Sequence, residues 1–481
     1  MTPIIVWFRR DLRLADNPAL TNGCARGPAV YPVFIWAPDE EGAWAPGAAS
    51  RYWLHQSLQC LDGALRALGS CLIVRRGPTL PTLLALVKET GAGVVLWNRC
   101  YEPSLIKRDI EIKRALTAAG VEAASSAASL LFEPNAVKTQ AGGAFKVFTP
   151  YWRHCKKLSE PGAPLGAPTS ISTPSSEVES LPIDALKLEP RIDWAGGVRA
   201  RWKFGEAAAQ SALDTFIDSA AQGYSDARDQ PHKEGVSRLS PYLHFGELSP
   251  KQVWSAMCQH EMHAGRITIS SATEAFLRQL VWREFAHYLL YHFPHTIDAP
   301  LRPEFERFPW RSDERSLSAW QRGETGYPIV DAGMRELWTT GWMHNRVRMV
   351  VASFLVKHLL LDWRHGARWF WDTLVDADLA NNTLGWQWTA GCGADAAPYF
   401  RIFNPVSQGA RFDPDGVYVK KWLPALAHMP AKYVHSPWRA SGEVLARAQI
   451  QLDVDYPLPI VDHDFARKRA LAAWETIRRH R

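Results

Sequence analysis

The segment Asp376–Trp388, with the sequence DADLANNTLGWQW, contains the residue types that can hold a flat ligand with polar edges. Its carboxylates, amide and indoles belong to Asp376, Asp378, Asn382, Trp386 and Trp388. Carboxylates accept hydrogen bonds, an amide both donates and accepts them, and indoles offer flat aromatic faces, as a redox cofactor requires. The same composition fits a capped turn around residues 383–385, where Asp and Asn bond the local backbone. Both interpretations stay open on this segment alone.

A helical pattern over residues 273–293 places a second group of polar side chains on one face. Gln279, Trp282 and Arg283 have the i, i+3 and i+4 spacing, so a helix presents them together. An amide, an indole and a guanidinium on one face can stack on a planar ligand and fix it by hydrogen bonds. A solvated face with one amphipathic tryptophan would show the same spacing.

A short loop and another helical pattern contain groups that can bind anions, namely backbone N–H donors and an arginine. The loop 234–240, EGVSRLS, offers consecutive backbone N–H donors that can cradle a phosphate, although one short loop is a weak signal by itself. In the pattern GWMHNRVRMV, one side of a helix carries Asn345, Arg348 and Met349. A buried Arg348 needs a carboxylate partner, and Asp376 is the candidate.

The sequence lacks the common signatures of hydrolases, zinc enzymes and P-loop proteins. There is no GxSxG, HExxH, Walker A or EF-hand pattern, and none of the 16 histidines has metal-ligand spacing, so no metal is expected. The 7 cysteines are scattered without a CxxC pair, which favours a reducing compartment. The N-terminus does not follow the order of a signal peptide, and no run of about 18 apolar residues occurs. We therefore expect a cytoplasmic protein without a membrane segment.

Length and composition set broad limits. The 481 residues suggest two or three domains, and the net charge of +6 permits a polyanionic partner without requiring one. Tryptophan stands out, because 22 residues of this type fit either core packing in a large helical domain or roles in stacking and electron transfer.

The N-terminal part alternates between β-rich and helical patterns. Short apolar runs occupy 4–8, 29–36, 71–74 and 93–98, and helical patterns fill 50–69 and 80–91. This alternation predicts βαβ units on a parallel sheet. No GxGxxG follows any of these runs, so the sheet need not bind a dinucleotide.

Residues 156–190 are rich in Pro, Ser, Gly and Ala, which is typical of an interdomain linker. Helical periodicity follows at 206–221, 273–293, 333–342, 344–361 and 367–376, with Pro294 expected to end the second of these helices. The sequence therefore predicts an α/β N-terminal domain with a Rossmann-like parallel sheet, followed by a larger all-α domain. The predicted boundaries are 1–130 for the α/β domain, 131–200 for the linker and 201–481 for the all-α domain.

Several long motifs, in order along nearly the whole chain, resemble the photolyase/cryptochrome family. They are VWFRRDLRLADNPAL, SRLSPYLHFGELSP, WREF, GYPIVDAGMRELWTTGWMHNRVRM, DADLANN, GWQW and DAAPYFRIFNP. The resemblance is greatest to bacterial cyclobutane pyrimidine dimer photolyases of the class I and class III types. It implies an antenna function for the N-terminal domain, and an all-α domain that holds FAD and binds DNA.

The resemblance implies flavin contacts and an electron path, residue by residue. The residues implied to hold FAD are Tyr224, Val236, Ser237, Arg238, Leu239, Ser240, Phe276, Arg283, Asn345, Arg348, Asp376, Asp378 and Asn382. Those implied to be catalytic are Trp386, Trp363, Trp310, Asn382 and Gln279, with the three tryptophans forming a relay from flavin to surface. The activity implied is that of a deoxyribodipyrimidine photo-lyase, a carbon–carbon lyase that uses photoexcited reduced FAD as its electron donor.

The partner implied is UV-damaged DNA. The residues that match DNA or lesion contacts are Arg228, Gln279, Trp282, Asn345, Arg346, Met349, Trp388, Arg401 and Gln408. Trp282 and Trp388 match the walls of the site for a lesion flipped out of the duplex, a movement that photolyases use. Arginine contacts to phosphates would make affinity fall with salt. We expect a monomer.

Three positions depart from the pattern of dimer photolyases. Val236 stands where threonine is common, Phe276 where tryptophan is common, and Gln279 where glutamate bonds the lesion. Glutamine there is also a feature of (6-4) photolyases and some cryptochromes, so (6-4) repair and cryptochrome-like blue-light reception remain alternatives. Asn345 and Met349 stand where (6-4) enzymes carry histidine, which favours dimer repair.

The antenna pigment stays open. One family branch binds folate with an Asn-Glu pair, where this chain has Ser104 and Leu105. Residues 40–54, EEGAWAPGAASRYWL, instead resemble photolyases related to plant cryptochromes. Methenyltetrahydrofolate, a deazaflavin and no antenna at all are the alternatives.

Overall fold

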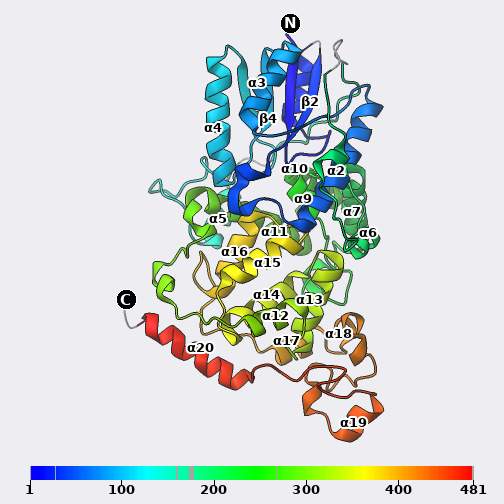
Figure 1. Cartoon of the computed structure of the whole chain (residues 1–481), viewed down its shortest axis with the longest axis vertical. Coiled ribbons are helices and arrows are strands. Elements are labelled where there is room, and N and C mark those ends of the chain that lie inside the picture. The colour runs from blue at the N-terminus through cyan, green and yellow to red at the C-terminus, as the bar shows by residue number, and fades with distance from the viewer. Residues whose placement is uncertain (1, 28, 159–160, 173–177, 267, 479–481) are drawn as a thin grey trace. The chain divides into compact units, whose positions relative to one another are not determined.

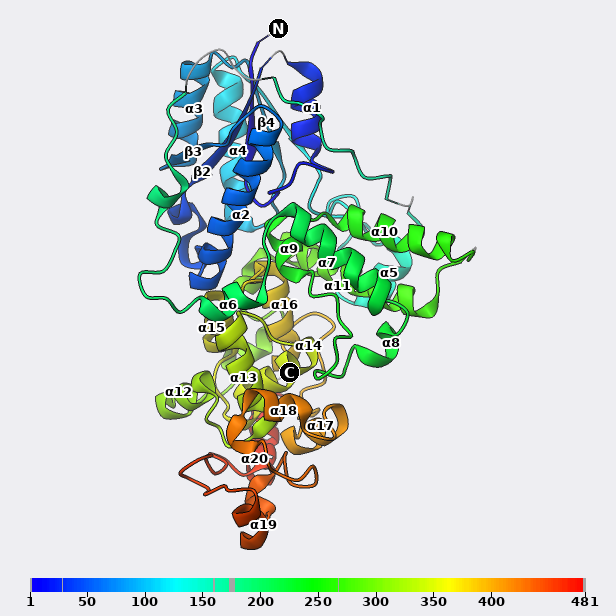
Figure 2. The same cartoon turned by 90° about the vertical axis from the view of Figure 1, so that its right-hand side faces the viewer.

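The computed structural model describes residues 2–27, 29–158, 161–172, 178–266 and 268–478. They fall into two compact units, whose elements are labelled in Figure 1 and Figure 2. The first unit comprises Met1–Gln222, Ser237–Pro294 and Val375–Asp378, and the second comprises Gly223–Val236, His295–Leu374 and Leu379–Arg481.

The first unit is built on a five-stranded parallel sheet with the strand order β3-β2-β1-β4-β5. The strands are β1 (Ile4–Phe8), β2 (Val30–Trp36), β3 (Ile73–Arg76), β4 (Val94–Asn98) and β5 (Glu122–Ser126). The first four confirm the predicted runs, although β3 begins at Ile73 rather than Cys71. β5 was not predicted, because its sequence EAASS has no large apolar side chain.

Different helices cover the two faces of the sheet. Helices α1 (Pro18–Arg26), α2 (Ala48–Ala67), α3 (Thr79–Thr90) and α4 (Pro103–Ala118) connect the strands (Figure 2). On one face, Trp7 shares a buried cluster with Leu83 of α3 and Ile112 of α4. On the other face, α1 lies so close that a side chain at Gly23 would meet Val6. The alternation of side chains along β1 therefore supplies both cores.

The carboxyl ends of β1 and β4 are filled by side chains of the chain itself. The Arg9 guanidinium lies 4.4 Å from the Trp7 ring centre, forms a 2.5 Å ion pair with Asp109 and donates to the Asn98 carbonyl. The strand order changes direction between β1 and β4, and parallel sheets with a dinucleotide fingerprint bind their ligand at this point. The buried arginine there agrees with the missing GxGxxG pattern.

Six further helices belong to the first unit. They are α5 (Phe148–Cys155), α6 (Gly196–Arg201), α7 (Glu206–Ser219), α9 (Ser240–Phe245), α10 (Pro250–His263) and α11 (Ser271–His292). α11 begins where the Ser270 hydroxyl accepts from the Thr273 N–H at 3.2 Å, and it ends at His292. Pro294 follows the C-cap residue Phe293 and prevents the helix from continuing, as predicted, because proline cannot donate to a helix ladder.

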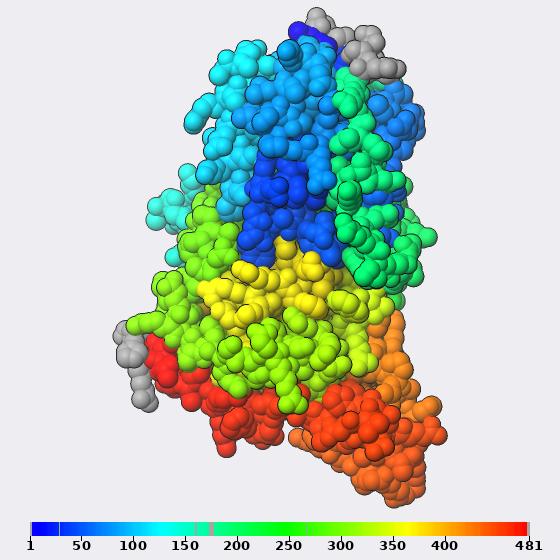
Figure 3. Space-filling model, in the orientation of Figure 1, coloured from blue at the N-terminus to red at the C-terminus, as the bar shows by residue number. Residues whose placement is uncertain are grey.

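The predicted linker 156–190 has one short helix among its described residues, the 3-10 turn η2 (Ile183–Leu186); residues 159–160 and 173–177 lie outside them. The segment packs along the α/β layer, because the Leu181 N–H donates to the Val74 carbonyl at 2.9 Å. Figure 3 shows the green segment after residue 178 on the surface of this layer. The domain boundaries at 130 and 200 stay a prediction.

The second unit is helical throughout its described residues. Its α-helices are α8 (Tyr224–Ala227), α12 (Glu314–Arg322), α13 (Pro328–Thr340), α14 (Asn345–Ser353), α15 (Trp363–Thr373), α16 (Leu379–Ala390), α17 (Pro405–Phe412), α18 (Val417–Trp422), α19 (Gly442–Arg447) and α20 (His463–Arg478). The 3-10 turns elsewhere in the chain are η1 (Pro38–Trp44), η3 (Pro294–Ile297), η4 (Pro303–Arg307), η6 (Pro424–Leu426) and η7 (Pro437–Arg439). The single helix predicted over 344–361 was wrong in detail, since α14 passes into a π-helical turn at Phe354–His358. Hydrophobic periodicity cannot distinguish one such turn from an α-helical one.

Across the described part of the chain, no helix is both long and apolar enough to cross a bilayer. The same residues contain no group of three or more His, Cys, Asp or Glu placed to hold a metal ion. The cysteines at 24, 60, 71, 100, 155, 258 and 392 are all free thiols.

Candidate cofactor and DNA site

The predicted site residues divide between the two units. The first unit contains Ser237, Arg238, Leu239, Ser240, Phe276, Gln279, Trp282, Arg283, Asp376 and Asp378. The second contains Tyr224, Arg228, Val236, Trp310, Asn345, Arg346, Arg348, Met349, Trp363, Asn382, Trp386, Trp388, Arg401 and Gln408.

The predicted phosphate loop has the backbone of an anion-binding nest. Arg238 has the left-handed φ of 52°, and Leu239 follows with φ −81° and ψ −5°. A left-handed residue next to a right-handed one turns successive N–H groups toward one concave side. A non-glycine residue adopts positive φ at a cost in free energy, so the backbone is strained at Arg238.

Asp376 and Asp378 are held in place by side chains from two helices. The Ser240 hydroxyl donates to Asp376 Oδ2 at 2.6 Å. Asp378 Oδ2 lies 3.2 Å from Nε2 of His287 and 3.8 Å from Nδ1 of His244. Burial would raise the pKa of Asp378, but the His287 charge and the bonds to both histidines hold that pKa well below its ordinary value. The first unit therefore keeps this buried carboxylate ionised.

Arg283 is engaged with the backbone of its own unit. It donates to the carbonyls of Ser129 at 2.8 Å and Leu243 at 3.4 Å. Its neighbour Glu284 is buried and accepts from the N–H of Leu131, and burial raises the pKa of Glu284 to about 7. These bonds fix the orientation of α11 and hence of the face that carries the predicted lesion contacts.

That face of α11 carries an indole whose plane is fixed. Trp282 stacks on Phe148 with ring centres 3.7 Å apart and an interplanar angle of 5°. One face of the indole is therefore covered, and only the opposite face can meet a ligand. The Gln279 amide donates to the Ala275 carbonyl at 3.3 Å, and Phe276 packs in the core against Phe216 with centres 4.5 Å apart.

In the second unit, the segment that follows Asp378 is helical. The turn considered around residues 383–385 is wrong, because these residues lie inside α16. Gly385 is tolerated there because it lies on the exposed side, while buried Thr383 and Trp386 hold the helix. Asn382 donates from its amide nitrogen to the Ala367 carbonyl at 2.9 Å, which leaves its oxygen available as an acceptor.

The three tryptophans predicted to form a relay, Trp310, Trp363 and Trp386, all belong to the second unit. A side chain at Gly366 would overlap the ring of Trp386, so this indole lies directly on α15. Trp363 is the first residue of α15, one turn before Gly366. Leu361, just before that helix, forms an isolated β-bridge with the backbone of Arg311, and Arg311 follows Trp310 in the chain. Trp386 and Trp363 are each 2% exposed and Trp310 is half-buried, so the order runs from interior to surface.

The predicted DNA residues of the second unit are exposed or half-buried. Arg346 forms a 2.8 Å ion pair with Asp229 and lies 4.5 Å from the Phe412 ring centre. Arg348 donates to the Met343 carbonyl at 2.7 Å. Whether Arg348 also pairs with Asp376 stays a prediction, because the two residues belong to different units.

Three residues near the site were not predicted. His287 and His244 contact Asp378, and Lys357 in the π-helical turn donates to the Arg401 carbonyl at 3.0 Å. A lysine in the apolar run VASFLVKHLLL was a visible signal. The histidines offered none, since the partner of each is distant in sequence.

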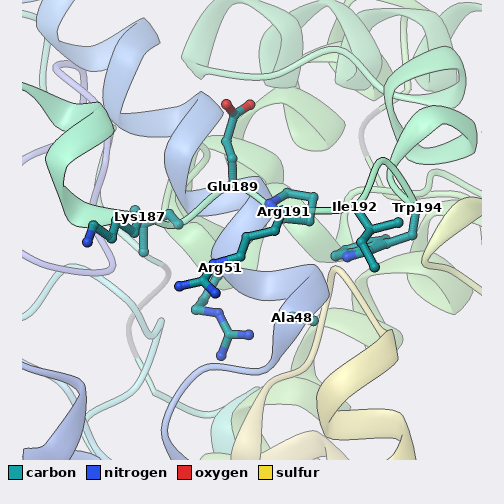
Figure 4. A pocket seen from close by; sticks show the side chains of 9 residues that line it. Ala48, Arg51, Lys187, Glu189, Arg191, Ile192 and Trp194 are labelled. Atoms are coloured by element: carbon teal, nitrogen blue, oxygen red, sulfur yellow. The ribbon is translucent and has the colours of Figure 1, made fainter.

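An open pocket of about 330 Å³ lies elsewhere on the first unit (Figure 4). Its lining residues are Ala48, Arg51, Lys187, Leu188, Glu189, Pro190, Arg191, Ile192 and Trp194. Figure 4 shows the Glu189 carboxylate pointing away from the guanidinium of Arg51. None of these residues was predicted to contact flavin or DNA.

Comparisons with known proteins match nearly the whole chain to one protein family. Residues 4–169 match a family model described as DNA photolyase, and residues 276–476 match one described as the FAD binding domain of DNA photolyase. The deoxyribodipyrimidine photo-lyase of Agrobacterium fabrum is 47% identical over 99% of this chain and 98% of its own length. Cryptochrome-1 of Arabidopsis thaliana is 42% identical over 97% of this chain and 69% of its own length.

A solved structure agrees with these relatives. The crystal structure of a bacterial class III photolyase from Agrobacterium tumefaciens has a TM-score of 0.96 and 46% identity, and the match covers 100% of this chain and 98% of that one. The predicted fold class, an α/β domain followed by a larger all-α FAD-binding domain, is confirmed.

The contact between Gly366 and Trp386 gives a matched pair of variants. Gly366→Ala forces a methyl group against the Trp386 ring, so we expect the free energy of unfolding to fall by about 1–3 kcal/mol and the near-UV circular dichroism to change. Gly385→Ala meets no atom within 4 Å, and we expect a gain of about 0.5–1 kcal/mol from helix propensity. Denaturant unfolding measures both values. Equal effects in the two variants would show that Trp386 does not rest on Gly366.

Lys357 makes stability depend on pH. Burial lowers its pKa from 10.5 to about 7 in the folded state. Between these values the unfolded chain binds the proton that the folded one lacks, so raising the pH favours folding. We expect the wild type to gain stability relative to Lys357→Met from pH 7 to pH 9, by at most about 1.4 kcal/mol per pH unit. Parallel unfolding curves for the two proteins across this range would contradict the assignment.

Proposed function

The chain belongs to the photolyase/cryptochrome family, and on that premise we propose that it repairs cyclobutane pyrimidine dimers in DNA with light, using reduced FAD as the electron donor. The observation that carries the proposal is the fixed pair of buried carboxylates, Asp376 and Asp378, in a chain that matches a deoxyribodipyrimidine photo-lyase along its whole length. This makes the protein a carbon–carbon lyase.

The described residues fit FAD. The nest at Arg238 and Leu239 suits a pyrophosphate, because its backbone N–H groups favour anions. Asp376 and Asp378 would accept from the N–H and hydroxyl groups of the flavin and ribose, and Asn382 would offer its free amide oxygen. When bound, reduced FAD supplies on illumination the electron that opens the cyclobutane ring.

The remaining predicted contacts would serve the DNA. Trp282, stacked on Phe148, would present its uncovered face to a flipped-out lesion, and Trp388 is proposed as the second stacking residue. Stacking on an aromatic side chain contributes roughly 1–3 kcal/mol per base. Arg228, Arg346 and Arg401 would bind phosphates, which are the main source of affinity for damaged and undamaged DNA alike.

The three tryptophans would keep the cofactor reduced. Trp386 and Trp363 are buried and Trp310 is half-buried, so an electron taken from a surface donor could travel inward through them. The contact of Trp386 with Gly366 fixes the inner indole on the helix that Trp363 begins. This order supports photoreduction of the flavin in the resting protein.

Gln279 is the residue that favours a second candidate function. Glutamine lacks the negative charge of the glutamate that dimer photolyases carry there, so a cryptochrome-like photoreceptor is the alternative, and (6-4) repair is a variant of the first proposal. Asn345 and Met349 argue against (6-4) repair, because that subtype carries histidines at both positions.

Several finer points are proposals as well. We propose domain boundaries at 130 and 200, a monomer in solution, a cytoplasmic location and an antenna pigment in the α/β layer. Methenyltetrahydrofolate and a deazaflavin are both candidates for that pigment.

Blue light tests the main proposal. The purified protein, with FAD bound and reduced, is illuminated with an oligonucleotide that contains one thymine dimer. We expect the dimer to disappear and intact thymines to return, with no change in the dark. Persistent dimers with fully reduced FAD would contradict dimer repair; loss of a (6-4) product in a parallel sample would indicate the variant, and light-dependent association without repair would indicate a photoreceptor.

Gln279→Glu tests the lesion contact. A carboxyl group should bond the bases more strongly than an amide, so we expect the repair yield to rise or the affinity for dimer DNA to change by about tenfold, a difference of about 1.4 kcal/mol. FAD content should stay constant. Gln259→Glu on the exposed side of α10 is the matched control, since it adds the same charge away from the site. Identical behaviour of both variants would place Gln279 outside the lesion site.

A further inference from the structure

His287 belongs to none of the sequence motifs, yet it contacts Asp378, one of the two carboxylates proposed to bind the flavin. His287 and Asp378 are 4% and 7% exposed, and Nε2 of the imidazole lies 3.2 Å from Oδ2 of the carboxylate. Nδ1 of the same ring lies 3.1 Å from the Arg283 carbonyl oxygen, one turn earlier in α11. Both ring nitrogens are therefore engaged, and all these residues belong to the first unit.

The partners of His287 determine its charge. A carbonyl oxygen only accepts hydrogen bonds, so Nδ1 must carry a proton. In a neutral ring, Nε2 would then aim a lone pair at an ionised carboxylate, which also only accepts. The contact is favourable only when Nε2 carries a second proton, that is, when His287 is an imidazolium.

The charged surroundings agree with this assignment. The groups that face the pair are Arg283 and Glu284 of α11, His244 of α9, Arg10 after β1 and Glu102 before α4. Burial by itself lowers the pKa of His287, but the attraction of Asp378 and its hydrogen bond outweigh burial and raise it. Arg10 forms ion pairs with Glu102 and Glu41, so its charge is already compensated. The imidazolium is thus a cation in direct contact with Asp378.

We propose that His287 is a positioning residue, a buried imidazolium that holds Asp378 as an oriented carboxylate and thereby raises the reduction potential of the bound flavin. This inference rests on the proposed function, in which Asp378 contacts FAD. An uncompensated carboxylate beside the flavin opposes the addition of electrons, because like charges repel strongly in a buried site. The imidazolium cancels that charge and favours the reduced state that photorepair requires.

The first experiment needs no cofactor. Nitrogen-15 NMR of the histidine-labelled protein, with the His287 signals assigned by their loss in His287→Gln, reports the protons on both ring nitrogens. We expect two protonated nitrogens for His287 at pH 8, where an ordinary histidine is neutral. A neutral His287 at pH 8 would overturn the proposal, whether or not the protein binds FAD.

The second experiment measures the flavin directly. In the FAD-loaded protein at pH 8.5, we expect His287→Gln to shift the ratio of reduced to oxidised flavin at least tenfold toward oxidised, about 30 mV for a two-electron couple. His287→Arg retains a cation and should restore most of the potential. His292→Gln, on the same helix and bonded to the Pro134 carbonyl, is the control and should leave the potential unchanged.

The outcomes separate the two proposals. An unchanged potential in His287→Gln with normal FAD content would overturn the role of His287 while leaving photorepair intact. A wild-type protein that cannot take up FAD would overturn the proposed function and the effect on potential together, and the NMR result would still decide the charge of His287. A variant that fails to fold is replaced by His287→Asn, which removes the charge with a smaller side chain.

Discussion

A buried carboxylate that must stay ionised is the constraint on which the first unit depends. Asp378 is 7% exposed, and an isolated charge in such surroundings would take up a proton. The chain prevents this with His287, His244 and a wider set of ion pairs that begins at Arg10 and Glu102. These residues come from a strand end, a helix N-terminus and two later helices. The carboxylate therefore requires that the α/β layer and the helices of this unit fold together.

The second unit accommodates buried polar groups differently. Asp331 accepts from the hydroxyls of Thr325 and Tyr456 and from the Gly326 N–H, so it is solvated by neutral donors. Burial raises the pKa of Asp331, in contrast to Asp378. Lys357 donates to a carbonyl oxygen, but burial lowers the pKa of Lys357 and so favours the neutral amine. Contacts with histidines hold the pKa of Asp378 low, whereas burial shifts the pKa of Asp331 and of Lys357 toward the neutral form.

Regular patterns were readable from the sequence, and local exceptions were not. Runs of β-branched residues predicted β1, β2 and β4, since both faces of a parallel strand are apolar. The polar strand β5 was not predicted, because the sequence EAASS becomes a strand only through its pairing with β4. The motif Asp376–Trp388 stood out by its composition, but its glycine suggested a turn where burial of Trp386 maintains a helix. The partners of Asp378 could not be found at all, because contacts distant in sequence leave no periodicity.

The sequence gives the type of each residue, whereas neighbouring residues set the orientation of its side chain. Tryptophans at 282 and 386 can be recognised as candidate stacking and relay residues by type, yet the plane of each indole is set by another residue. Phe148 lies parallel to Trp282, and the absence of a side chain at Gly366 admits Trp386. Stacking and electron transfer both depend on ring orientation, so these supporting residues are as necessary as the tryptophans. A chain with every motif residue but a bulkier residue at 366 would carry the signature of the family and lose the geometry that the relay needs.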